Sequence, residues 1–173
     1  MKKLFSLLLI CMVLLSVLPA YAEKAEENLI YNGDFSILDS SGMPDGWKKE
    51  MWHTDAGVSM LGISENGYTG NCAVVNNVDA NDARFSQKIS VEPDSIYHFS
   101  CMVKAENCGG EGYGATISFS DCFTYSEEAL DTGGEWQQIS VYGRTGKKQK
   151  DITIFIRVGG YGSLSTGANY GFF

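Results

Sequence analysis

The sequence predicts an all-β fold of two packed antiparallel sheets, and three observations support this. Short runs of alternating apolar and polar residues recur along the chain, as expected of strands that bury one face. Twenty glycines, together with Asn, Asp and Ser, separate these runs as turn residues do. No long stretch has apolar residues at the helical period. Frequent turns between short strands therefore favour a sandwich.

Two segments show the alternation most clearly. In residues 96–105 the apolar odd-numbered positions share one face, and His98 lies on the other. In residues 151–158 the isoleucines are expected to face the core, with Phe155 and Arg157 on the opposite side. Further strands are expected at residues 58–62, 72–77, 84–91, 114–120 and 136–144.

Residues 1–22 are typical of a secretory signal peptide. Lys2 and Lys3 precede an apolar run over residues 4–18, and Ala20-Tyr21-Ala22 is a small-residue cleavage site. A membrane span needs about 20 apolar residues, so this shorter run favours cleavage over the alternative, an uncleaved anchor. The protein is therefore expected to be secreted or on the extracellular cell surface, with no membrane insertion after cleavage.

After cleavage, residues 23–27 form a charged linker, and residues 28–173 form one domain. The full chain has a formal net charge of −8, and loss of Lys2 and Lys3 leaves 11 basic against 21 acidic side chains. Nucleic acids and anionic lipids attract clustered Lys and Arg, so an acidic chain argues against both as partners.

The sequence offers little for catalysis. His53 and His98 are the only histidines, and the chain has neither a Gly-x-Ser-x-Gly motif nor a His-Glu-x-x-His motif. The acidic residues in pairs are interpreted as solvated side chains of surface turns: Asp79, Asp82, Glu127 and Glu128. We therefore expect a protein that is not itself an enzyme.

Five short motifs, in order, carry a family resemblance. Residues 28–35 read Asn-Leu-Ile-Tyr-Asn-Gly-Asp-Phe, and residues 44–47 read Pro-Asp-Gly-Trp. Residues 70–75, 85–100 and 135–138 continue the series with glycines and core-type apolar residues. The series resembles the carbohydrate-binding modules attached to xylanases and cellulases, the families numbered 4, 9 and 22.

The resemblance implies a galactose-binding-like jelly-roll β-sandwich that binds a polysaccharide or other glycan on one sheet face without chemistry. Such a domain would be a monomeric module of a larger secreted or cell-surface protein. Trp47 and Trp136 match core positions of the family. The alternative is a structural or adhesive β-sandwich spacer that does not bind sugar.

The chain departs from the family at two places. The family's last strand runs into paired aspartates, whereas residues 168–173 reach the aromatic residues and stop, so the last strand is expected to be truncated. Many members hold a structural calcium ion, but Ser36 replaces an acidic ligand here and the terminal aspartate is missing. The loss of two carboxylates is expected to weaken any such calcium site severely, so no cofactor is expected beyond a weakened structural calcium ion, and Asp34 is interpreted as a turn residue.

Sugar sites combine flat aromatic rings with hydrogen-bonding side chains. Alternation places candidate residues of both kinds on the solvent side of a sheet, and Trp52 follows the Gly-Trp turn beside it. The predicted ligand-binding residues, expected to share one sheet face, are Trp52, Arg84, His98, Tyr142 and Arg157.

Four cysteines lie in the expected domain: Cys72, Cys101, Cys108 and Cys122. An even number in an exported domain permits two disulfides, and buried free thiols are the alternative. If the strand ending at Cys108 returned as a hairpin through residues 114–120, Cys101 would lie nearly opposite Cys122.

Overall fold

The computed structural model describes residues 28–110, 112–120 and 124–173. The predicted signal peptide, the linker and Cys122 lie outside the described residues. Over the described residues the chain forms nine strands and no helix, and it therefore contains no helix that could cross a membrane. Their bounds are β1 Lys48–Met51, β2 Ser59–Ser64, β3 Cys72–Asn81, β4 Ala83–Ser90, β5 Ile96–Gly109, β6 Ala115–Phe119, β7 Gln137–Arg144, β8 Asp151–Val158 and β9 Ser165–Phe172.

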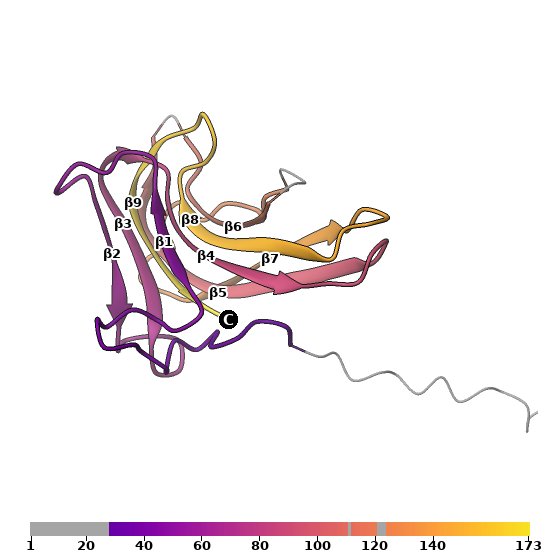
Figure 1. The fold of residues 1–173 in the computed structure, drawn as a ribbon. Coiled ribbons are helices and arrows are strands. Elements are labelled where there is room, and N and C mark those ends of the chain that lie inside the picture. Colours follow the sequence, from indigo (N-terminus) through magenta and orange to yellow (C-terminus); the bar gives the residue numbers. More distant parts are fainter. Residues whose placement is uncertain (1–27, 111, 121–123) are drawn as a thin grey trace, which may run out of the picture.

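The strands form two stacked antiparallel sheets, which confirms the predicted all-β sandwich (Figure 1). The four-stranded sheet has the order β1-β4-β8-β6, and the five-stranded sheet has the order β2-β3-β9-β5-β7. The neighbours β4 and β8 belong to the first sheet, and the neighbours β5 and β7 belong to the second. The face of each sheet that points away from the other sheet is its outer face.

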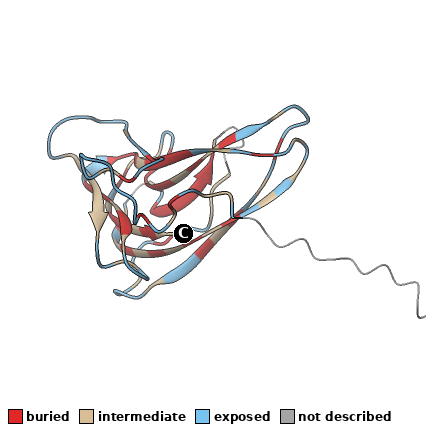
Figure 2. Cartoon of the chain, turned by 60° about the horizontal axis from the view of Figure 1, so that its bottom comes forward, coloured by how far each residue is buried: buried red, intermediate tan, exposed pale blue. Residues whose placement is uncertain are grey.

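Alternating side chains from both sheets fill the core between them. Phe85, Ile154 and Ile156 of the four-stranded sheet are fully buried, as are Val75 and Val103 of the five-stranded sheet. Buried residues, red in Figure 2, occupy the middle of the sheets, and exposed residues gather at loops and strand ends. The predicted inward and outward faces of residues 96–105 and 151–158 are therefore confirmed.

Aromatic rings from both ends of the described chain close one end of the core. Phe35 lies 5.1 Å from Trp47, and Phe173 stacks on Trp47 at 5.6 Å and on Phe99 at 4.7 Å, all between ring centroids. The predicted core position of Trp47 is confirmed, since its exposed fraction is 5%.

Two strands escape the sequence pattern. The first, β1, has four residues with two adjacent lysines, and β9 contains two glycines and little apolar alternation. Nevertheless β9 lies in the middle of its sheet, where it pairs with β3 from Ala73 to Asn81 and with β5 from Met102 to Gly109. The expected truncation of this last strand stays a prediction.

The hairpin expected between residues 96–108 and 114–120 is wrong. The first of these segments, β5, pairs with β7 and β9, whereas β6 pairs with β8 in the other sheet. The hairpin argument for a Cys101–Cys122 pair therefore fails. Cys72, Cys101 and Cys108 are buried free thiols, and burial raises the pKa of Cys108 to about 11.

Candidate functional site

A row of polar side chains crosses the outer face of the four-stranded sheet. The strand register places Glu50 of β1 opposite Arg84 of β4, Arg84 opposite Arg157 of β8, and Arg157 opposite Thr116 of β6. These positions alternate with buried core residues, so all four project away from the core. We call this surface the arginine face, defined by Glu50, Trp52, Asp82, Arg84, Tyr125, Phe155 and Arg157.

The arginine side chains are fixed by two carboxylates. Asp82 Oδ2 accepts hydrogen bonds from Arg84 Nη1 at 2.8 Å and from Arg157 Nη2. Arg84 Nε donates to Glu50 Oε2 at 2.9 Å, and Ser86 Oγ donates to Glu50 Oε1 at 2.6 Å. The two positive and two negative charges cancel, and the fork geometry holds each guanidinium in one orientation.

Glu50 is kept ionised by these contacts. Burial alone would raise the pKa of Glu50, but hydrogen bonds from Ser86 and Arg84 outweigh burial and hold the pKa below its usual value. Glu50 is therefore a hydrogen-bond acceptor at neutral pH and not a proton donor.

Aromatic rings surround the guanidinium groups. The Arg84 guanidinium carbon lies 5.0 Å from the centre of the Phe155 ring, and that of Arg157 lies 5.6 Å from the same ring and 5.2 Å from the Tyr125 ring. Tyr125 stacks on Tyr113 with 4.8 Å between ring centroids and 12° between planes. Cation–π contacts and stacking thus fix the rings relative to the arginines.

Exposed aromatic side chains form the rim of the arginine face. The exposed fraction is 68% for Trp52, 78% for Tyr161 and 42% for Tyr113. Trp52 follows β1 directly, and its backbone N–H donates to the Asp82 carbonyl oxygen at 2.9 Å. Asp82 therefore contacts three of the predicted site residues, Trp52 through its backbone and both arginines through its carboxylate.

Two buried asparagines support this arrangement from beneath. Asn81 Oδ1 accepts from the backbone N–H of His53, and Asn81 Nδ2 donates to the His53 carbonyl oxygen and to Ser59 Oγ. Asn77 Nδ2 donates to the carbonyl oxygens of Asn81, Val158 and Ser165. These bonds fix the chain after Trp52, the β3–β4 turn and the end of β8.

The floor of the arginine face contains polar atoms without a protein partner. Among the described residues, Asp82 Oδ1, Arg157 Nε and Thr116 Oγ1 are buried and make no hydrogen bond. Because these atoms are buried, they lie out of reach of a ligand on the outer face and are not contact points for it.

The structure brings only some of the predicted ligand-binding residues together. Trp52, Arg84 and Arg157 share the arginine face, whereas His98 and Tyr142 lie opposite each other on β5 and β7, on the outer face of the five-stranded sheet. The expectation that one sheet carries all five is wrong, because alternation gives a side chain's face within a sheet but not which sheet its strand joins.

Asp82 was misinterpreted from the sequence as a solvated acid. Its exposed fraction is 5%, and it pairs with both arginines. The sequence did contain a sign of this pairing. Asp82, Arg84 and Ser86 are spaced two residues apart, which places a carboxylate and a guanidinium on the same face of a strand. The core position expected for Trp136 is also wrong, since this residue is partly exposed and its ring lies 5.8 Å from Lys104 Nζ.

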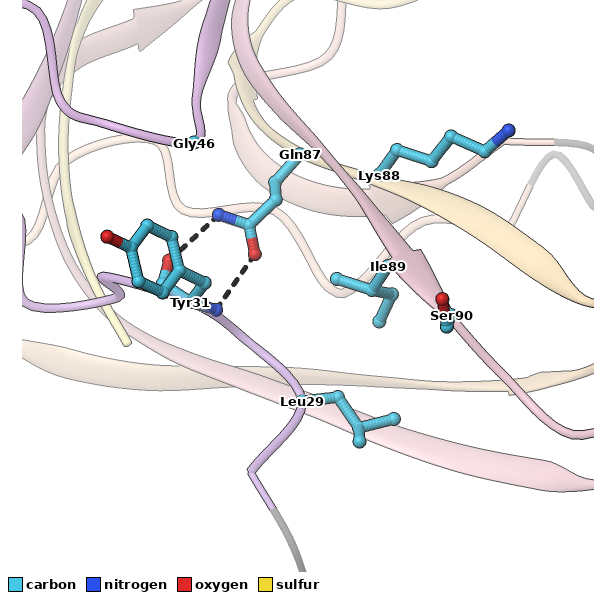
Figure 3. A pocket seen from close by; sticks show the side chains of 7 residues that line it. All are labelled: Leu29, Tyr31, Gly46, Gln87, Lys88, Ile89 and Ser90. Carbon is cyan, nitrogen blue, oxygen red and sulfur yellow. Dashed lines mark hydrogen bonds between the residues drawn. The ribbon is translucent and has the colours of Figure 1, made fainter.

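A pocket of about 360 Å³ lies away from the arginine face, where the N-terminal segment meets β4 (Figure 3). The side-chain amide of Gln87 in this pocket already has protein partners. Its Oε1 accepts from the Tyr31 N–H at 2.9 Å, and its Nε2 donates to the Tyr31 carbonyl oxygen at 2.8 Å. Lys88 at its edge pairs with Asp151 at 3.0 Å. The pocket therefore anchors the N-terminal segment and offers no set of free polar groups.

The residues at the N-terminal stretch where the resembled family holds calcium make turn and backbone contacts that do not suit an ion. Asp34 Oδ1 accepts from the backbone N–H and the hydroxyl of Ser36, as a turn residue does, and Asn71 Nδ2 donates to the Phe35 carbonyl oxygen. Among the residues that the structure describes, no group of three or more His, Cys, Asp or Glu side chains could hold a metal.

The fold and the arginine face together define a β-sandwich that presents aromatic rings and fixed polar groups on a sheet surface. Similar solved structures include TmCBM61 in complex with beta-1,4-galactotriose, with a TM-score of 0.56, 17% identity and coverage of 85% of this chain and 95% of that chain. A family 16 carbohydrate-binding module matches with a TM-score of 0.51, 19% identity and coverage of 84% and 96%. A CBM4 structure matches with a TM-score of 0.50, 20% identity and coverage of 82% and 94%.

The predicted resemblance to carbohydrate-binding modules is therefore confirmed in the fold. No protein-family model matches the sequence, and no curated protein matches it.

Proposed function

We propose that this chain is a non-catalytic carbohydrate-binding module that binds a glycan on the arginine face. The observation that carries the proposal is the exposed ring of Trp52 beside an immobilised, electroneutral network of four side chains: Glu50, Asp82, Arg84 and Arg157. The carbohydrate-binding modules that share its fold support the proposal.

Binding would use two kinds of contact. The Trp52 ring stacks on the C–H face of a sugar, and the partly exposed side chains of Arg84 and Glu50 exchange hydrogen bonds with its hydroxyls. Because Arg84 is already held by Glu50 and Asp82, little side-chain freedom is lost when a ligand binds.

The same geometry speaks against hydrolysis on this face. A glycoside hydrolase needs a carboxylic acid with a raised pKa to protonate the leaving group. Glu50 has a lowered pKa, and Asp82 is bound to two arginines. Secretion through the predicted signal peptide and a role as a monomeric module within a larger protein belong to the same proposal.

The decisive variant is Trp52→Ala, tested by retention on a panel of polysaccharides that includes beta-1,4-galactan, xylan and cellulose. Loss of one stacking ring is expected to weaken retention about tenfold. The melting temperature is expected to stay unchanged, because the ring is 68% exposed. Tyr31→Ala is the matched control, since Tyr31 is half exposed and lies in the pocket at the N-terminal segment.

If the wild type and the Trp52→Ala variant are retained equally, the arginine face is not the glycan-binding site. If the wild type is retained on none of the polysaccharides, the alternative of a structural or adhesive spacer is favoured.

A further inference from the structure

The outer face of the five-stranded sheet carries a second set of aromatic side chains, on the opposite side of the sandwich from the arginine face. The set follows the outward positions of β5 and its neighbours β7 and β9, together with Trp136, which directly precedes β7. We call it the β5 track, defined by His98, Lys104, Trp136, Tyr142, Tyr170 and Phe172.

One end of the β5 track is a stacked pair. His98 and Tyr142 occupy facing positions on β5 and β7, and their rings stack with 4.4 Å between centroids and 19° between planes. Tyr142 is 65% exposed, so one side of this stack is open to a ligand.

The other end is a group of rings around an ammonium group. Lys104 Nζ lies 4.4 Å from the Tyr170 ring centre and 5.8 Å from the Trp136 ring centre. Tyr68, which is half exposed, meets Trp136 edge-on at 6.0 Å and Phe172 at 6.1 Å. The cation–π contacts fix these rings as a surface platform.

The two ends lie in line along one strand. His98 and Lys104 are six residues apart on β5 and share its outward phase, so about 20 Å of strand separates them. Between them the facing outward positions hold Ser100 opposite Ser140 and Met102 opposite Gln138. Hydroxyl and amide groups thus lie between the two aromatic ends of the track.

The charge of the β5 track selects an uncharged ligand. The ammonium group of Lys104 lies 3.9 Å from Glu106 Oε1, so a carboxylate already balances it. A protein partner would favour a contiguous apolar centre, whereas this surface places two serines, a glutamine and a single apolar residue, Met102, between its rings. Ring platforms with neutral polar groups between them match the apolar faces and hydroxyl edges of successive sugar units.

We propose that the β5 track is a second glycan-binding surface for a linear, uncharged polysaccharide, which makes the chain bivalent. The occupant is the sugar chain itself. Binding on the β5 track does not depend on the arginine face, because each outer face belongs to a different sheet, whereas bivalency rests on the proposed function of the arginine face.

The test measures cross-linking of a soluble polysaccharide as well as binding. Soluble beta-1,4-galactan and soluble xylan are mixed with the protein, turbidity reports cross-linking, and affinity electrophoresis in the same polymers reports binding. The wild type is expected to raise turbidity with the polymer that it binds. Trp136→Ala combined with Tyr142→Ala is expected to abolish that turbidity while binding through the arginine face persists. Met60→Ala is the matched control, because Met60 is exposed on the same outer face but lies on the edge strand β2.

Comparison with Trp52→Ala separates the two proposals. If turbidity and binding survive the double variant unchanged, the β5 track is not a glycan site, whatever Trp52→Ala does. If Trp52→Ala leaves binding unchanged and the double variant abolishes it, the arginine face fails and the β5 track stands. If the double variant loses its thermal transition, Tyr142→Ala is tested alone. Its melting temperature is expected to stay unchanged, because the ring is exposed. Its turbidity is expected to fall at least fivefold, because one ring platform of the β5 track is lost.

Two further results would overturn the inference. Light scattering that shows a wild-type dimer, dissociated by the double variant, would identify a second copy of this chain as the occupant. Absence of wild-type turbidity with both polymers, or of binding to them, would also count against bivalent glycan binding.

Discussion

Arg157 illustrates how a charged residue can be both part of a ligand face and part of the stable structure. Its exposed fraction is 4%, and the Asp82 carboxylate that it contacts is almost equally buried. Removing one member of a buried ion pair leaves the other charge without its compensation, which is among the costliest changes to a fold.

Arg157→Met is therefore expected to lower the free energy of unfolding by about 3 kcal/mol. Arg84 still pairs with Asp82 in this variant, but it compensates the buried negative charge only in part. Urea denaturation measures this change. The matched control is Arg144→Met, because the pair between Arg144 and Asp94 is exposed and such pairs contribute at most about 1 kcal/mol. Equal losses in the two variants would show that burial of Arg157 does not determine its contribution.

For a single residue, the sequence predicts on which face of the strand the side chain lies, but not which distant residues bury it. Alternation correctly placed Arg84 and Arg157 outward from the core. It could not show that Tyr125, from a loop more than thirty residues before Arg157, lies against the guanidinium. Although alternation places Arg157 on the solvent side of its sheet, its side chain is covered by Tyr125, so Arg157→Ala is expected to destabilise the protein.

Elements that look alike in sequence separate in space. Residues 96–105 and 151–158 show the same alternation, yet β5 and β8 belong to different sheets. Strand pairing depends on contacts between residues far apart in the chain, such as Arg84 opposite Arg157. The alternation within one strand does not predict which other strand it pairs with. The divided set of predicted site residues follows directly from this limit.

The ends of several elements meet at one buried amide. Asn77 Nδ2 donates to the carbonyl oxygens of Asn81, Val158 and Ser165, which belong to β3, β8 and β9. Asn77→Ala leaves these buried acceptors without that donor, and a loss of about 3 kcal/mol in unfolding free energy is expected. Thermal or urea unfolding provides the measurement.

The neighbouring Asn76→Ala is the control for this prediction. Asn76 lies on the same strand with the opposite phase, on the outer face, so its removal is expected to change stability by less than about 0.5 kcal/mol. A large effect of Asn76→Ala, or a small effect of Asn77→Ala, would contradict the assigned role of the buried amide.

For the whole molecule, the two-sheet sandwich could be predicted but the strand order could not. The recurring turns and alternation indicate two stacked sheets, whereas β1 and the central position of β9 have no local signature. Part of the reason is Gly171, where an added Cβ would lie 2.8 Å from Ile156 Cγ2. Close approach of the two sheets thus requires a residue that weakens the strand pattern.

The position of β9 leads to the last prediction, a comparison of a deletion with a point variant. Removal of residues 165–173 takes away the strand between β3 and β5, so both lose a row of backbone hydrogen bonds and their core face opens to water. We expect this variant to lose its cooperative thermal transition, as measured by circular dichroism. Phe173→Ala keeps β9 and removes only a partly exposed ring packed on Trp47 and Phe99, so it is expected to melt cooperatively with about 2 kcal/mol less stability. A deletion variant that melts cooperatively near the temperature of the full chain would mean that β3 and β5 hold their places without the strand between them.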